Sequence, residues 1–280
     1  MVSANLHTHC RFCDGTGEPE EYVSEALKQG FSAIGFSSHA PLPFFVSFVM
    51  KNDSLADYCA SIRVLKQKYH GQLEIYLGLE VDYVPGVVGP ASPQFTELGL
   101  DYTIGSVHLI RNGKSGEFLG VDDTYEKYER LLCEVFDGEM ARFGTRYFSL
   151  IRSMLEEHRP TIVGHLDLLK KLNRGNKYFA ENELWYRAEI AQTLTAIAKA
   201  GSILEVNTGG MSRGYTDIPY PSPWILAEAK KLGIPVTITS DAHQAINLSA
   251  YYDLAMDILK DAGYRRQTIL QQGQWVGINL

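Results

Sequence analysis

Six of the eight histidines stand in short motifs along the chain, and together with the carboxylates Glu80 and Asp241 they could bind several metal ions. Neutral imidazole and carboxylate suit Zn²⁺, Fe²⁺ and Mn²⁺, and one carboxylate can bridge two ions. In His7-Thr8-His9, residues i and i+2 point to the same side of an extended backbone, so both rings can reach one ion. The candidate ligands are His7, His9, His39, Glu80, His108, His165, Asp241 and His243.

Two further aspartates are candidates for supporting this chemistry. Asp14 precedes Gly15, and because Asp-Gly is a turn signal by itself, a turn explains Asp14 about as well as metal binding does. Asp14 can nonetheless fold back over His9, so we include it among the candidate ligands. Asp167 lies two residues after His165, and we expect it to orient a ligand imidazole.

Three residues outside the ligand set are candidates for substrate contact. An anionic substrate favours a guanidinium group, which Arg213 or Arg111 can supply. A solvated loop charge explains either arginine equally well. Asn207 ends a predicted strand and is not a typical metal ligand, so we expect it to contact substrate or to support a ligand, with a simple turn as the alternative.

These residues need a scaffold that brings distant segments together. Short apolar strands alternate with helical patterns along the whole chain, which indicates right-handed βαβ units and a parallel sheet. We predict an α/β fold, a distorted seven-stranded (β/α)7 barrel similar to a TIM barrel, with an open doubly wound sheet as the alternative. The predicted strands cover 4–7, 32–37, 73–81, 102–109, 161–165, 202–207 and 236–240, and the predicted helices include 19–29, 125–157, 186–199 and 223–233.

The candidate ligands lie at the C-terminal ends of six of these strands, where α/β barrels carry their active sites. Ordinary packing explains any one histidine, but it does not explain six at matching positions. His70 and His158 lie instead near predicted helix C-termini, where the helix dipole favours a cation, and they need no function.

Composition limits the class of protein. The chain has 280 residues and a net charge of −7, which argues against a surface for nucleic acid polymers or anionic lipid. It has neither an 18-residue apolar run nor a signal-peptide pattern. Cys10 and Cys13 form C-x-x-C without a second pair, so we favour packing over a structural zinc site. We expect one domain over residues 1–280, a cytoplasmic location, no membrane contact, and a monomer or homodimer.

Seven motifs resemble those of the PHP (polymerase and histidinol phosphatase) family, and specifically its histidinol-phosphatase branch. Each motif is weak alone, but the ordered set is specific. The motifs are His7-Thr8-His9, Ser38-His39, Gly78-Leu79-Glu80-Val81-Asp82-Tyr83, Gly105-Ser106-Val107-His108, Gly164-His165-Leu166-Asp167-Leu168, Glu205-Val206-Asn207-Thr208 and Ser240-Asp241-Ala242-His243.

The resemblance implies a distorted barrel with two or three divalent ions, which would be Zn, Mn or Fe. Many relatives have a histidine near the position of Asp14, and a basic segment typically begins at the position of Ser212. This chain departs from the family pattern at both places. The implied ligands are His7, His9, Glu80 and Asp241 for one ion, Glu80 with His108 and His165 for the second, and Asp14, His39 and His243 for the third.

The resemblance also implies an activity, the hydrolysis of L-histidinol phosphate in histidine biosynthesis. Glu80 as the bridge and Asp241 as a group that orients the nucleophile would be the catalytic residues, and the partner would be a small anionic phosphoester. The alternative is a PHP phosphoesterase that acts on nucleotides or other small phosphoesters. A third reading, a non-enzymatic metal-binding protein, predicts a broken ligand set, whereas the set here is intact.

Overall fold

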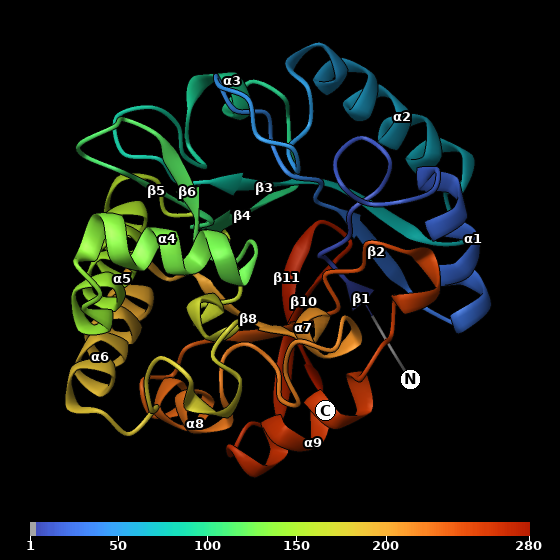
Figure 1. The fold of residues 1–280 in the computed structure, drawn as a ribbon. Helices are drawn as coiled ribbons and strands as arrows, with labels where there is room; N and C mark the ends of the chain where they lie inside the picture. The colour runs from blue at the N-terminus through green and yellow to red at the C-terminus, as the bar shows by residue number, and fades with distance from the viewer. Residues whose placement is uncertain (1–3) are drawn as a thin grey trace.

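The computed structural model describes residues 4–280 and contains a seven-stranded parallel sheet that curls into a barrel (Figure 1). Beyond the two end strands, Thr8 and Ala242 form a parallel bridge, and the His9 amide donates to the Ala242 carbonyl at 2.9 Å. This bridge closes the sheet, so the predicted barrel is confirmed and the open sheet is wrong. In spatial order the strands are β1 (Ala4–Asn5), β2 (Ala33–Phe36), β3 (Glu74–Asp82), β4 (Tyr102–Ser106), β7 (Ile162–Val163), β8 (Ile203–Asn207) and β9 (Val236–Thr239).

Helices surround the barrel (Figure 1), and local sequence signals set several of their ends. Pro19 occupies the first turn of α1, and Gly30 ends that helix with φ 77°. The helix predicted over 125–157 is wrong in one respect, because Asp137 and Gly138 take positive φ values and divide it into two. The helices are α1 (Pro19–Gln29), α2 (Leu55–Lys68), α3 (Pro93–Thr96), α4 (Tyr125–Phe136), α5 (Met140–Glu157), α6 (Leu184–Ala200), α7 (Gly209–Ser212), α8 (Pro223–Lys231) and α9 (Tyr252–Asp261).

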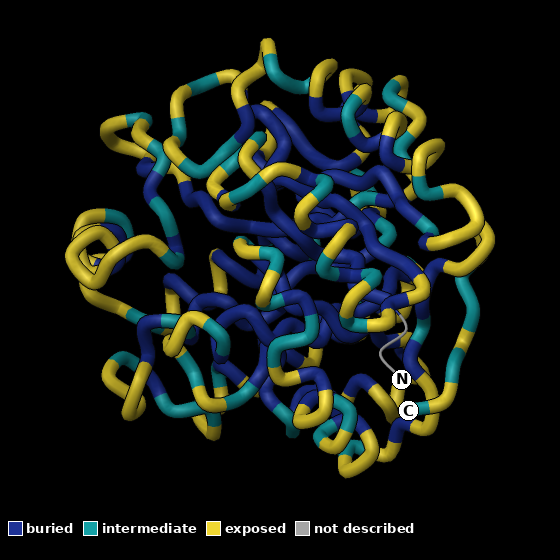
Figure 2. Tube along the Cα trace, turned by 90° about the vertical axis from the view of Figure 1, so that its right-hand side faces the viewer, coloured by how far each residue is buried: buried dark blue, intermediate teal, exposed yellow. Residues whose placement is uncertain are grey.

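The barrel interior is filled by side chains rather than open. The Tyr102 side chain lies against Gly35 and Gly78, where an added Cβ would come within 2.3 Å of its hydroxyl and within 2.5 Å of its ring. The Tyr102 hydroxyl donates to the Leu6 carbonyl at 2.5 Å. Figure 2 shows the buried segments gathered inside the molecule and the exposed ones outside. Among residues 4–280, no helix is long and apolar enough to cross a membrane.

Two antiparallel hairpins accompany the barrel. The first consists of β5 (Leu109–Arg111) and β6 (Phe118–Gly120), so the strand predicted over 102–109 ends earlier, at Ser106. The second consists of β10 (Arg266–Gln271) and β11 (Gln274–Asn279). Its apolar side chains join a buried cluster with residues such as Ala4 and Ala33, which stand at the N-terminal ends of barrel strands. This hairpin therefore covers the end of the barrel opposite the candidate ligands.

Candidate metal centre

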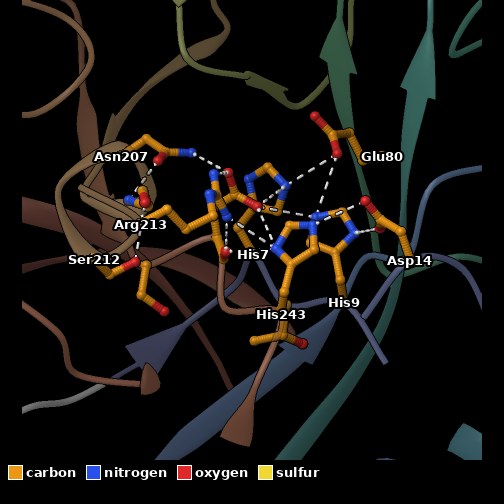
Figure 3. A network of polar contacts seen from close by, with 12 residues as sticks. His7, His9, Asp14, Glu80, Asn207, Ser212, Arg213 and His243 are labelled. Atoms are coloured by element: carbon orange, nitrogen blue, oxygen red, sulfur yellow. Dashed lines mark hydrogen bonds and ion pairs between the residues drawn. The ribbon is translucent and has the colours of Figure 1, made fainter. Parts of the chain in front are cut away.

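The candidate ligands meet at the C-terminal end of the barrel (Figure 3). Glu80 lies within β3, and the others follow β1, β2, β4, β7 and β9, so parallel strands deliver them to one place. Only Asp14 and His243 retain substantial side-chain exposure, at 34% and 24%. The residues that the structure brings together are His7, His9, Asp14, His39, Glu80, His108, His165, Asp241 and His243.

One oxygen of Glu80 points at three imidazole rings. Its Oε2 lies 3.2 Å from His7 Nε2, 3.4 Å from His9 Nε2 and 3.0 Å from His39 Nδ1. All four atoms are buried, and none has a hydrogen-bond partner. Buried polar atoms without partners are costly in a folded protein. Their convergence on a small space fits the donor set of a cation.

The other oxygen of Glu80 points at a second pair of rings. Its Oε1 lies 2.9 Å from His165 Nε2 and 3.6 Å from His108 Nε2, and the Ser106 hydroxyl donates to it at 2.7 Å. The two histidine nitrogens are 3.2 Å apart. A single carboxylate thus separates two groups of nitrogen ligands, which is the geometry of a bridge between two ions.

The two oxygens of Asp241 also contact different groups. Its Oδ1 lies 3.1 Å from His9 Nε2 and 3.7 Å from His7 Nε2. Its Oδ2 accepts from Arg213 Nη2 at 2.8 Å and from Asn207 Nδ2 at 3.3 Å. One oxygen therefore remains directed at the histidines while the other is held in place.

Asp14 belongs to a third group at the exposed edge of the cluster. Its Oδ2 lies 3.3 Å from His243 Nε2, and its Oδ1 lies 3.8 Å from His39 Nε2. A Cβ on Gly15 would fall 2.2 Å from the His9 backbone, so glycine permits the loop to fold back this closely. His39 has its two nitrogens turned to different carboxylates, Glu80 and Asp14.

The pKa shifts of these side chains also fit a site for cations. Burial raises the pKa of Glu80, but the rings of His39 and His7 outweigh it and hold this pKa well below its ordinary value. Burial lowers the pKa of His9 to about 3, so this ring is neutral and can ligate. Its Nδ1 contacts the Cys13 thiol at 3.4 Å, which leaves Nε2 directed at the carboxylates.

The structure adds two carboxylates that the sequence analysis did not select. Asp82 accepts from His108 Nδ1 at 3.0 Å, and Glu205 lies 2.5 Å from His7 Nδ1. Each stands two residues from a selected residue on the same strand, Glu80 or Asn207, and residues at this spacing share a face of a strand. This spacing is the feature of the sequence from which Asp82 and Glu205 could have been selected.

Asp167 does not orient a ligand imidazole, so that expectation is wrong. It pairs with Lys170 Nζ at 2.8 Å and accepts from the Ser222 amide at 3.0 Å. The imidazole of His7 instead contacts Glu205 at 2.5 Å, and Glu205 also accepts from the His165 backbone amide at 2.6 Å.

The three residues predicted to contact substrate lie in different parts of the structure. A cleft of about 610 Å³ opens over the cluster, and Arg213 lines it. Arg111 instead lines a separate depression beside α5. Asn207 is fully buried behind Asp241 and contacts Glu205. Lys171, which was not selected from the sequence, lines the cleft and pairs with Asp122 at 2.9 Å.

Known proteins are similar to this chain in sequence and in fold. The PHP domain matches residues 5–209 of this chain. The histidinol-phosphatase of Bacillus subtilis (strain 168) is 32% identical over 268 residues, which cover 92% of this chain and 99% of that protein. A histidinol phosphate phosphatase from Lactococcus lactis subsp. lactis, solved with zinc, L-histidinol and phosphate, has a TM-score of 0.71 with 22% identity, and the match covers 98% of both chains. The chain therefore belongs to the PHP family, in its histidinol-phosphatase branch.

Proposed function

We propose that this chain is a metal-dependent phosphomonoesterase that hydrolyses L-histidinol phosphate to L-histidinol and phosphate. The observation that carries the proposal is the position of Glu80, whose two oxygens face separate groups of histidines. The substrate is supported by the Bacillus subtilis relative and by the ligands of the Lactococcus lactis structure.

The proposed ligand assignment is the one that the resemblance to the PHP family implies, and the contacts of the two Glu80 oxygens with His7 and His165 support it. Divalent ions bound there would neutralise phosphate charge and lower the pKa of bound water to roughly 7. We propose His7, His9, Glu80 and Asp241 for the first ion, Glu80, His108 and His165 for the second, and Asp14, His39 and His243 for the third.

The side chains around the cluster would bind and orient the reactants. Arg213 contacts Asp241 and lines the cleft, so its guanidinium can also donate to a phosphate oxygen. Lys171 adds a second positive charge on the cleft wall. Asp241 Oδ1 would accept a hydrogen bond from the attacking water and orient it toward phosphorus. The new P–O bond forms as the ester P–O bond breaks, and the leaving alkoxide takes up a proton.

The cleft also offers a surface for the organic end of the substrate. Phe45, Phe118 and Tyr215 line it, and Phe45 is 94% exposed at its rim. Aromatic rings of this kind favour stacking with a small planar group such as imidazole. Asp122 lies in the same wall, where Lys171 balances its negative charge at 2.9 Å.

Phosphate release from a substrate panel tests the proposal. The panel contains L-histidinol phosphate, nucleoside monophosphates and p-nitrophenyl phosphate, and the protein is loaded in turn with Zn, Mn or Fe and analysed for metal. We expect kcat/KM to be highest for L-histidinol phosphate and activity to vanish after chelation. A preference for nucleoside monophosphates would support the alternative activity, and no release from L-histidinol phosphate with any metal would refute the proposal.

A further inference from the structure

The Glu205 carboxylate lies in the barrel interior and contacts two different groups of proposed ligands. It is fully buried on β8. Its Oε1 lies 2.5 Å from His7 Nδ1, and its Oε2 accepts from the His165 amide at 2.6 Å. Each oxygen of Glu205 contacts one of these groups and one further hydrogen-bond donor. Neither oxygen is therefore directed at the proposed ions.

The further contacts complete the acceptor capacity of the carboxylate. Oε1 accepts from the Thr239 hydroxyl at 2.6 Å, and Oε2 accepts from Asn207 Nδ2 at 3.1 Å. A carboxylate has two acceptor oxygens with about four lone-pair sites in total. Four groups approach Glu205, two at each oxygen, so every site is used.

We propose that Glu205 is a positioning residue that selects the tautomer of His7 required for metal binding. Glu205 only accepts, so His7 must carry its proton on Nδ1. The lone pair then lies on Nε2, which is the nitrogen directed at Glu80 and Asp241. This inference rests on the proposed metal assignment.

A glutamine at position 205 would break this arrangement in a defined way. Its NH₂ group must face one pair of former donors. The His165 backbone amide cannot become an acceptor, and the Asn207 side chain is held because its Oδ1 accepts from the Gly209 amide at 2.8 Å. The Thr239 hydroxyl can rotate, and His7 can change tautomer. The NH₂ group would therefore turn toward His7 and force its proton onto Nε2.

The experiment compares Glu205→Gln with Thr239→Val and the wild type. Thr239→Val removes one donor to the same oxygen but leaves the carboxylate, so it is the matched control. Metal content and stepwise affinity are measured for Zn and for Mn. We expect Glu205→Gln to bind the first ion about 10- to 100-fold more weakly, the range known for groups that orient ligand histidines. Thr239→Val should retain wild-type metal content.

The outcomes separate this inference from the proposed function. If wild type binds fewer than two ions, the metal assignment fails. If wild type binds them and Glu205→Gln matches it within about twofold, or if Thr239→Val loses the same ion, the role of Glu205 is refuted. Should Glu205→Gln not fold, ¹⁵N NMR of metal-loaded wild type decides, because His7 must show a protonated Nδ1. An unprotonated Nδ1 would overturn the inference.

Discussion

Arg213 connects the metal ligands with the cleft. Its guanidinium donates to Oδ2 of Asp241 at 2.8 Å and to the Asp241 carbonyl at 2.9 Å. The side chain remains 31% exposed and lines the cleft. A guanidinium carries five donors in a planar fork, so it can hold Asp241 and still bind a phosphate oxygen. A lysine ammonium does not reproduce that fork.

Arg213→Lys should lower kcat/KM for L-histidinol phosphate about 10- to 100-fold, which corresponds to the loss of about 1.5–3 kcal/mol from a hydrogen bond to a charged group. Arg111→Lys is the control, because Arg111 lines a different depression, and it should leave the rate within twofold of wild type. Steady-state phosphate release measures both. Equal rates for the two variants would show that Arg213 has no such role.

Residue types and their positions at strand ends were enough to predict which histidines gather with Glu80 and Asp241, whereas for Asp14 a turn explained the sequence about as well as metal binding did. They were not enough to predict the residues behind them. Glu205 lies in a strand that has no candidate ligand, and its contacts with His7 and His165 depend on how three strands align. The exclusion of Arg111 from the cleft likewise depends on the β5–β6 hairpin, which the sequence analysis did not predict.

The hairpin β10–β11 stabilises the barrel at the end away from the proposed site. Ile269 and Leu270 of β10 are each 2% exposed and belong to the buried cluster that includes Tyr76 and Tyr102. Gln267 Oε1 also accepts from the Ile238 amide of β9 at 3.2 Å. Apolar burial of this kind contributes to stability without contact with the cleft.

Ile269→Ala should lower the free energy of unfolding by about 2–5 kcal/mol, as expected when a buried isoleucine is truncated and leaves a cavity. Ile246→Ala is the matched control, since Ile246 is 64% exposed, and it should change stability by less than about 0.5 kcal/mol. Urea denaturation of the metal-loaded protein measures both. A loss below about 1 kcal/mol for Ile269→Ala would contradict a structural role for the hairpin.

The barrel strands could be predicted because short apolar runs alternate with amphipathic helices. Their ends were less accurate, since the backbone leaves the sheet before the ligands: β1 ends at Asn5 and β7 ends at Val163. The two antiparallel hairpins were missed. The strands β5 and β6 have three residues each and β11 is partly exposed, so the patterns of these three strands differ from that of a buried barrel strand.

At the scale of the whole molecule, the proposed metal centre depends on closure of the barrel. His7 and Asp241 come from opposite ends of the chain, and the bridge between Thr8 and Ala242 brings them together. Metal binding should therefore stabilise the closed barrel as a unit. The single domain over residues 1–280, the cytoplasmic location, the monomer or homodimer and the absence of nucleic acid polymers among its partners stay predictions.

A crystal structure of the protein loaded with zinc, with anomalous difference maps that locate each ion, tests the bridging role of Glu80 most directly. We expect one ion at Glu80 Oε2 with His7, His9 and Asp241, and a second at Glu80 Oε1 with His108 and His165. Zinc should lie about 2.0–2.2 Å from each ligand atom. An ion bound to one Glu80 oxygen alone, with none at the other, would contradict the bridging role of Glu80.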